Sequence, residues 1–254
     1  RSIIHRLMAD LLPAGHDGVT LSCDESGVLT LSLDRGENRV DKAMVDALTA
    51  ALTIVESRPH PKALLVTSGG EKFFMNGLDL QWMSEHAEQA ISVLEGFWRL
   101  LARLLTLDCH TVAAVNGHAF GAGVFLALAC DWRLMRTRRG FLCFPELNLG
   151  MRLSKGFAEL SKAKLAPATL REAVLTGKRY GSAAALAAGL IDGECAIEEL
   201  HAEATRCCIS MLPGSLKLAR FDPTALHTMK VELYTDAFRA LSSGLTQADP
   251  MSRL

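Results

Sequence analysis

Hydrophobic and polar residues alternate with two different periods in the first part of the chain. From Val19 to Arg35 they alternate at every second residue on both sides of a glycine turn, a pattern typical of a β-hairpin. After Asp41, a favourable helix N-cap, apolar residues recur at helical spacing to about Glu56. We therefore expect two strands followed by a helix.

Strands and helices continue to alternate through the middle of the chain. Four apolar runs predict strands, over 62–68, 110–116, 132–137 and 141–144. Between the first two runs, helical spacing predicts one long helix from Asp79 to about Leu107. Further helices are expected to begin at Ser154, Ala168 and Ser182. Because strands that are apolar throughout belong to covered sheets, the pattern predicts an α/β fold.

The pattern changes near residue 197. From Ile197 onward it is almost entirely helical, with segments near 197–211 and 223–243, and no low-complexity linker divides the chain. We expect a core over residues 1–196, of which 1–18 are an N-terminal extension. Residues 197–254 are expected to form a helical region that serves oligomerisation.

The composition fits one large domain and argues against several classes of partner. The chain has 254 residues, 49% of them hydrophobic, which is enough for a sizeable core. Its 27 basic and 28 acidic residues leave a net charge of -1, so no long-range field attracts nucleic acid or anionic lipid. No apolar run reaches the roughly 18 residues that cross a bilayer. We expect neither nucleic acid nor a membrane as a partner.

Cysteine and histidine residues do not indicate a disulfide framework or a metal site. The seven cysteines are odd in number and include no CxxC pair, so we expect reduced thiols. His110 and His118 flank a predicted strand, without a third ligand at suitable spacing. We predict no metal.

Both ends of the chain carry candidate targeting signals. Ser252-Arg253-Leu254 resembles the Ser-Lys-Leu tripeptide that directs proteins to the peroxisomal import receptor. Residues 1–18 are basic and amphipathic like a transit peptide, but Asp10 and Asp17 favour a short helix that ends near Pro13. We expect a peroxisomal or related microbody location, with the cytoplasm or the mitochondrion as alternatives.

Two glycine-containing loops each join a strand to a helix. In "VNGHAFGAGVFLALACD", residues 115–131, a strand and a turn at Gly117-His118 lead to Gly-Ala-Gly at the first turn of an apolar helix. In "GGEKFFMNGLDL" the same order ends at Gly77-Leu78. Two such crossings in neighbouring units would direct the free N–H groups of Leu78 and Ala122 at one oxygen, as an oxyanion hole does. Taken alone, the residues also fit an Asn-Gly turn and close helix packing.

These segments together resemble a known family. The stretches "AAVNGHAFGAGVFLALACDWRLM", "FFMNGLDL" and "FPELNLGM" resemble the crotonase (enoyl-CoA hydratase/isomerase) superfamily, and the likeness extends from about Val19 to Leu190. The resemblance implies a spiral of strand-strand-helix units with a helical C-terminal part that forms a homotrimer, single or paired with a second trimer. It implies an acyl-CoA substrate and no separate cofactor, because coenzyme A is part of the substrate.

The resemblance also assigns roles to individual residues. It implies that the N–H groups of Leu78 and Ala122 hold the thioester carbonyl. Hydratases of the family carry glutamates at the positions of Phe125 and Glu146. This chain keeps only Glu146, which resembles the arrangement in the 3,2-enoyl-CoA isomerases of the same family. Residues expected to bind substrate are Phe74, Met75, Asn76, Gly77, Trp82, Gly121 and Phe125.

A single carboxylate points to proton transfer within the substrate. Glu146 is expected to take a proton from the α carbon of a 3-enoyl-CoA and return it to the γ carbon, giving 2-trans-enoyl-CoA. An apolar neighbour such as Phe125 would raise the basicity of this carboxylate and exclude water. The alternatives are a thioester hydrolase, a hydratase, and a protein that binds acyl-CoA without turnover.

The terminal tripeptide can be tested independently of the fold. Deleting Ser252-Arg253-Leu254 is expected to leave folding and activity unchanged while a fluorescently labelled protein moves from punctate organelles to the cytosol. Fluorescence microscopy of the parent and the deletion variant measures this. An unchanged distribution would end the peroxisomal prediction.

Overall fold

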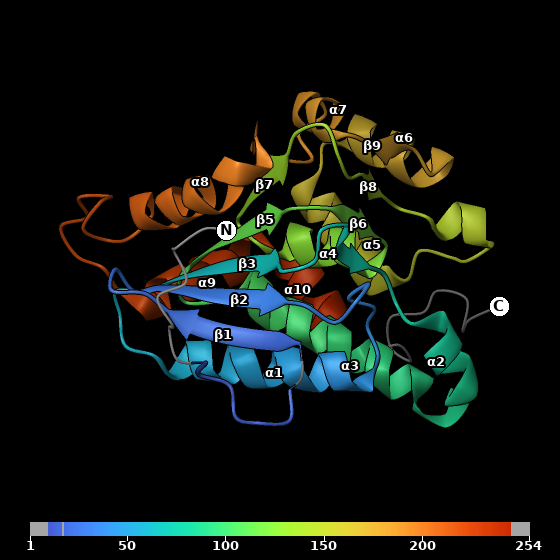
Figure 1. Ribbon diagram of the computed structural model, residues 1–254, viewed down its shortest axis with the longest axis horizontal. Coiled ribbons are helices and arrows are strands. Elements are labelled where there is room, and N and C mark those ends of the chain that lie inside the picture. Colours follow the sequence, from blue (N-terminus) through green and yellow to red (C-terminus); the bar gives the residue numbers. More distant parts are fainter. Residues whose placement is uncertain (1–9, 17, 245–254) are drawn as a thin grey trace.

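Two β-sheets and the helices that cover them make up the fold (Figure 1). The computed structural model describes residues 10–16 and 18–244. The predicted N-terminal helix and the terminal tripeptide therefore lie largely or wholly outside the described residues. The α/β class predicted from the alternating pattern is confirmed.

The larger sheet has six strands in the order β1-β2-β3-β5-β7-β10. They are β1 (Val19–Cys23), β2 (Val28–Leu33), β3 (Ala63–Ser68), β5 (His110–Val115), β7 (Trp132–Arg136) and β10 (Gly193–Cys195). The first two form the predicted antiparallel hairpin, and every later pairing in this sheet is parallel. The predicted strands near 62–68, 110–116 and 132–137 are thus confirmed, whereas β10 was not predicted.

Alternate residues of these strands enter two separate hydrophobic clusters. Leu64 and Val66 of β3 belong to the main core, beneath helices α1 (Lys42–Ser57) and α3 (Ala87–Leu105). Leu65 belongs to a smaller cluster on the other face, which helix α8 (Ile197–Ser210) covers. Because both faces are covered, the parallel strands are apolar throughout.

The smaller sheet has four strands in the order β4-β6-β8-β9. They are β4 (Phe73–Asn76), β6 (His118–Phe120), β8 (Leu142–Cys143) and β9 (Arg179–Tyr180). The first three are parallel, and β9 is antiparallel to β8. The predicted turn at Gly117-His118 is wrong at its second residue, because His118 pairs with Phe73 and begins β6.

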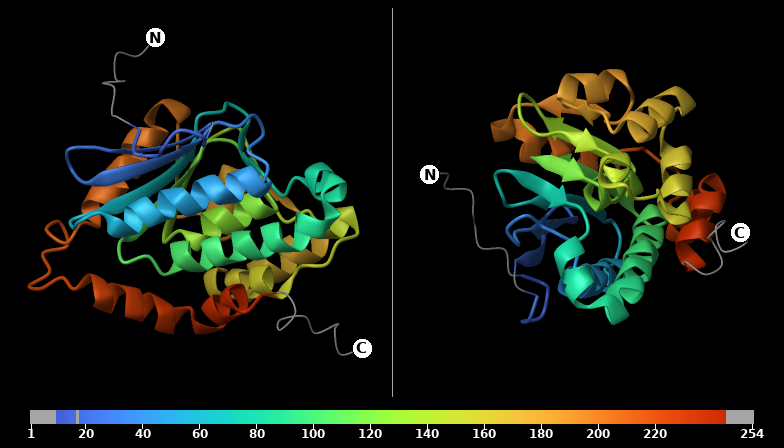
Figure 2. Two further views of the ribbon diagram at one scale, coloured as in Figure 1. Left: turned by 90° about the horizontal axis from the view of Figure 1, so that it is seen from below. Right: turned by 90° about the vertical axis from the view of Figure 1, so that its right-hand side faces the viewer.

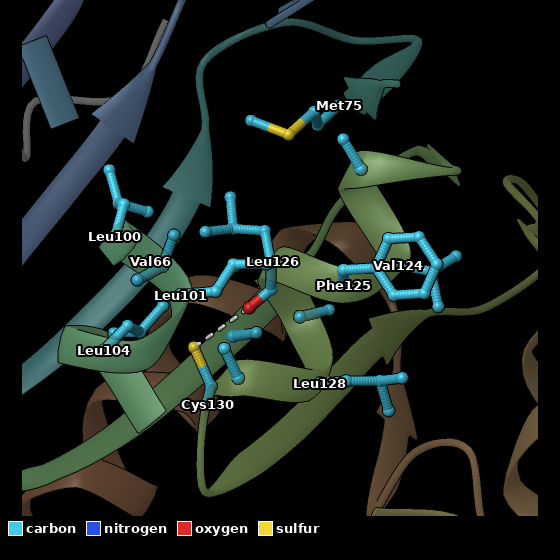
Figure 3. Packing of buried hydrophobic residues seen from close by; sticks show 14 of the residues in the cluster. Val66, Met75, Leu100, Leu101, Leu104, Val124, Phe125, Leu126, Leu128 and Cys130 are labelled. Atoms are coloured by element: carbon cyan, nitrogen blue, oxygen red, sulfur yellow. Dashed lines mark hydrogen bonds between the residues drawn. The ribbon is translucent and has the colours of Figure 1, made fainter. Parts of the chain in front are cut away.

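Helix α4 (Ala122–Ala129) lies against the smaller sheet, with all of its residues buried (Figure 3). Its approach to β4 depends on Gly123, since a Cβ atom there would overlap the carbonyl oxygen of Met75. Gly121 precedes the helix with φ of 51°, a conformation that side chains disfavour. The two glycines of the Gly-Ala-Gly segment therefore permit a close contact and a sharp entry into the helix.

The prediction of one long helix over 79–107 is wrong, because the segment forms two helices. The segment forms α2 (Leu80–Glu85) and α3, separated by His86 with φ of -127° and ψ of 52°. Asp79 caps α2 by accepting a hydrogen bond from the Trp82 N–H (3.0 Å). The His86 ring stacks on Trp82 at 4.3 Å, a local contact that helical spacing alone does not reveal.

The remaining helices follow the predicted order. They are α5 (Lys155–Lys164), α6 (Pro167–Thr176), α7 (Ser182–Ala187), α9 (Pro223–Leu233) and α10 (Thr235–Ser242). The helix predicted over 223–243 is interrupted at Tyr234, so that α10 packs against α3 and α5 (Figure 2). No helix between residues 10 and 244, residue 17 aside, is long and apolar enough to cross a membrane.

Candidate active site

Three parallel strands of the smaller sheet end at the same edge. The register pairs Asn76 with Phe120 and Phe120 with Cys143, which are the last residues of β4, β6 and β8. The segments that follow are therefore delivered side by side. They carry Leu78, Ala122 and Glu146, the residues to which sequence analysis assigned the chemistry.

The backbone around Leu78 leaves its N–H directed away from the neighbouring chain. Val40 donates a hydrogen bond to the Gly77 carbonyl and accepts one from the Asp79 N–H, both at 2.9 Å. These two bonds form a parallel bridge between Val40 and Leu78. In such a bridge the N–H of Leu78 itself points to the opposite side.

Ala122 presents a second backbone donor beside the first. It is the first residue of α4, where an N–H group has no acceptor within the helix. The preceding Gly121 is so close to the other loop that a Cβ atom on it would lie 3.7 Å from the Cα atom of Gly77. Leu78 and Ala122 both line one cavity, with the positive end of the α4 dipole at Ala122.

The cavity has a volume of about 520 Å³, within the range of small-molecule sites. Its lining is Arg39, Asn76, Gly77, Leu78, Leu80, Leu94, Phe120, Gly121, Ala122, Pro145, Glu146, Leu149, Met151, Arg152, Ser154 and Phe157. Most of these groups are apolar, and Glu146 is the only carboxylate among them. An acyl chain suits such a wall, with few polar groups to position its reacting end.

Glu146 lies in this wall as a half-buried side chain. It begins a short 3-10 helix, η1 (Glu146–Leu149), directly after Pro145. Burial raises the pKa of Glu146, and a hydrogen bond from its own backbone N–H only partly opposes the effect. Its Oε2 atom is buried and has no hydrogen-bond partner. A carboxylate with a raised pKa and an unpaired oxygen is a suitable general base.

The loop after Glu146 returns toward the same cavity. The Met151 N–H donates to the Glu146 carbonyl (2.8 Å), which closes the turn that carries the carboxylate. Three residues later, Ser154 precedes α5 without capping it through its side chain. Ser154 lines the cavity, and its Oγ atom is buried without a hydrogen-bond partner, like Glu146 Oε2. Both residues therefore carry a buried oxygen atom without a hydrogen-bond partner in the wall of the cavity.

Phe125 lies behind the cavity wall and does not line it. Its ring is fully buried and stacks on Phe157 at 4.0 Å, with an angle of 4° between the rings. It also meets the edge of Phe144 at 5.5 Å. Phe157 is the residue that lines the cavity, so the prediction that Phe125 contacts substrate is not supported by its position.

The other predicted substrate-binding residues divide into two groups. Asn76, Gly77 and Gly121 line the cavity, and the Asn76 Nδ2 atom donates to Glu37 (2.8 Å). Phe74 and Met75 are fully buried in the core, and Trp82 is half-buried beside His86. These three side chains are not part of the cavity lining.

Sequence analysis missed several residues that line the cavity. They include Leu80, Leu94, Leu149, Met151, Ser154 and Phe157. They come from α2, α3, η1 and α5 and from the loop between the last two, and no motif joins them. Only the folded chain brings these positions together.

Comparison with known proteins agrees with the geometry. Residues 24–248 match the enoyl-CoA hydratase/isomerase family. The peroxisomal enoyl-CoA delta isomerase 2 of Arabidopsis thaliana is 34% identical over 65% of this chain and 71% of its own length. Enoyl-CoA delta isomerase 3 of the same plant is 30% identical over 84% of this chain and 90% of its own.

A solved structure extends the similarity to the fold. A Mycobacterium tuberculosis protein, described as an enoyl-CoA isomerase in its apo structure and as a probable enoyl-CoA hydratase in another, is similar in fold. The apo structure has a TM-score of 0.80 and 26% identity, over 91% of this chain and 97% of that one. The strand-end cavity, the matched residues and the shared fold lead to one conclusion. This chain belongs to the crotonase superfamily, as an acyl-CoA enzyme of the enoyl-CoA hydratase/isomerase family.

Proposed function

We propose that the chain is a 3,2-trans-enoyl-CoA isomerase (EC 5.3.3.8), which shifts the double bond of a 3-enoyl-CoA to the 2 position in β-oxidation of unsaturated fatty acids. One observation carries the proposal: among the residues that the structure describes, Glu146 is the only carboxylate in a cavity that Leu78 and Ala122 also line. The relatives named as delta isomerases support it.

The first step removes a proton from the substrate. The Glu146 carboxylate takes a proton from the α carbon, and the bonding electrons delocalise over the thioester and the double bond. The resulting dienolate carries most of its negative charge on the thioester oxygen. The N–H groups of Leu78 and Ala122 hydrogen-bond that oxygen, and one such donor contributes about 100- to 1,000-fold in rate.

The second step returns the same proton. Protonated Glu146 donates it to the γ carbon, and the electrons move to form the double bond between the α and β carbons. Both carbons lie on one face of a planar intermediate, so one group reaches them in turn. Atoms and electrons balance without water, metal or any other reactant.

The aromatic wall favours isomerisation over hydration. Hydratases of the family place a second glutamate where this chain has Phe125, and here that ring lies in a stack with Phe157. Within the described ranges, 10–16 and 18–244, the lining holds no second carboxylate that could orient water. The apolar wall also raises the pKa of Glu146 and so its basicity.

Location and assembly remain part of the proposal. The names of two Arabidopsis relatives include "peroxisomal", which agrees with the interpretation of Ser252-Arg253-Leu254. Those three residues lie outside the described part of the chain. We propose a homotrimer, single or paired, with the core over 1–196 and the oligomerisation region over 197–254.

Replacing Glu146 tests the mechanism. Glu146→Gln keeps the size of the side chain and removes its basicity, so we expect acyl-CoA binding to persist and isomerisation to fall by about 1,000- to 10,000-fold. Because burial disfavours the charged form, the variant is expected to be at least as stable as the parent at neutral pH. Absorbance of the conjugated product, calorimetry and thermal unfolding measure these three properties.

A matched control is Glu198→Gln, at an exposed position on α8, which is expected to behave like the parent. Free thiol is measured in the same assay, because its release would indicate a hydrolase. If folded Glu146→Gln isomerises within about tenfold of the parent, Glu146 is not the base.

The raised pKa of Glu146 predicts a pH profile. The reaction needs the ionised form, so kcat/KM is expected to fall as the pH decreases through a value above the ordinary glutamate range. Initial rates measured across the acidic range at constant ionic strength give this limb. A rate that stays constant down to about pH 4.5, near the ordinary glutamate pKa, would contradict the assignment.

Supplying the second carboxylate is not expected to create a hydratase. Phe125→Glu would bury a charge between Phe157 and Phe144, away from the cavity surface. We expect a loss of stability of about 3 kcal/mol or more and no hydration of 2-enoyl-CoA. Phe125→Leu is the control for ring loss, and hydration by a folded Phe125→Glu variant would show that position 125 does reach the substrate.

A further inference from the structure

The far end of helix α4 is held by two cations, of which Arg133 is buried and Lys164 is half-buried. Cys130, the residue at the C-terminal end of α4 (Figure 3), accepts hydrogen bonds through its carbonyl from Lys164 Nζ (3.2 Å) and Arg133 Nη1 (3.1 Å). Lys164 is the last residue of α5. Its ammonium group also contacts the Tyr234 hydroxyl (3.1 Å) and lies 4.2 Å from the centre of the Tyr234 ring.

The charged side chains around Lys164 form ion pairs with one another, so Lys164 adds one positive charge to this cluster. Arg133 forms an ion pair with Asp192 at 3.1 Å. Lys230 of α9 pairs with Asp131 at 2.6 Å, and its Nζ donates to the Cys109 carbonyl. Lys164 instead uses a carbonyl, a hydroxyl and an aromatic ring.

We infer that Lys164 is a positioning residue of the oxyanion hole, which acts through α4 by holding the carbonyl end of the helix whose first N–H, at Ala122, receives the substrate oxygen. The inference rests on the proposed function. The buried ammonium group offsets the negative end of the helix dipole and leaves the positive end uncompensated at the cavity.

The size of the effect follows from the length of α4. Its 8 residues span about 12 Å at 1.5 Å per residue. A unit charge slightly beyond that distance, at an effective dielectric constant of about 20, changes the rate of a step that develops negative charge by about three- to tenfold. The ammonium charge changes the binding of the uncharged substrate far less than it changes the energy of the transition state. We therefore expect its removal to change kcat and not KM.

Stability does not account for the charge. Burial lowers the pKa of Lys164 to about 8, which means that folding disfavours the charged form relative to its state in water. Removing the ammonium group relieves this desolvation cost, which offsets the loss of its contacts with the Cys130 carbonyl and Tyr234. A structural role alone would not require an ammonium group at this position.

Two substitutions at position 164 separate charge from packing. Lys164→Met keeps most of the side-chain length without the charge, and we expect kcat to fall about three- to tenfold with KM unchanged and the unfolding midpoint unchanged or higher. Lys164→Arg keeps the charge and is expected to retain kcat within about twofold. Lys162→Met is the control, since Lys162 is on the same helix and is exposed.

The pH dependence gives a second readout. The parent is expected to lose kcat as the pH rises through about 8, with this limb absent in Lys164→Arg and Lys164→Met. The groups that face Lys164 are Cys130, Asp131, Arg133, Lys230 and Tyr234. Burial raises the pKa of Cys130 to about 12 and also raises that of Tyr234, while the His110 and Lys230 contacts lower that of Asp131, so none of these three groups titrates near pH 8.

Stability changes in the opposite sense. Between about pH 8 and the ordinary lysine pKa the unfolded chain binds more protons at this position than the folded chain, so the stability of the parent rises with pH. Any gain in unfolding midpoint from Lys164→Met is therefore expected to shrink above pH 8. If the difference in unfolding midpoint between Lys164→Met and the parent does not narrow above pH 8, Lys164 is not a charged group that burial destabilises.

A measurement without turnover separates this inference from the isomerase proposal. Butyryl-CoA with a ¹³C-labelled carbonyl is bound to each variant, and the infrared carbonyl band reports the polarisation of the thioester. We expect a smaller shift to low frequency with Lys164→Met than with the parent or Lys164→Arg. If the carbonyl band shifts as expected but the parent does not isomerise 3-enoyl-CoA, the proposed function is refuted and the role of Lys164 is retained. Equal carbonyl bands and equal kcat values, or losses that accompany unfolding in both variants, would refute the role of Lys164.

Discussion

The close contact between helix α4 and strand β4 is the constraint on which the site depends. Gly123 allows the helix backbone to reach the Met75 carbonyl, and any side chain there would separate the two elements. The distance between the Ala122 and Leu78 N–H groups follows from this contact, because one begins α4 and the other follows β4. The geometry of two backbone donors is thus set by the absence of one side chain.

Burial opposes the charge of one group near each end of α4. The carboxylate of Glu146 is kept where burial opposes its charge, and the ammonium group of Lys164 is kept where burial opposes a charge of the other sign. Neither arrangement favours folding. Both would favour a reaction in which a proton leaves carbon and negative charge develops on an oxygen beside α4.

Much of the framework could be predicted from the sequence, because the pattern of apolar residues reports burial directly. The hairpin, the parallel strands and the strand-to-helix position of Ala122 follow from it. At the break between α2 and α3 the His86 ring stacks on Trp82, a contact that residue spacing does not encode. The position of Phe125 behind Phe157 depends on two helices packing together, so a residue that motif comparison aligns with a catalytic glutamate lies outside the cavity wall.

The turn that carries Glu146 differs in kind from the two loops beside it. Leu78 is bridged to Val40 and Ala122 is anchored by its helix, whereas Glu146 begins a short helix whose Leu147 and Leu149 are exposed to solvent. Substitutions in this turn would disturb little of the core. Activation of the carbonyl and the choice of which carbon gains or loses a proton are therefore carried by separate parts of the chain. Such a division lets a lineage acquire new regiochemistry while its means of stabilising an enolate stays the same.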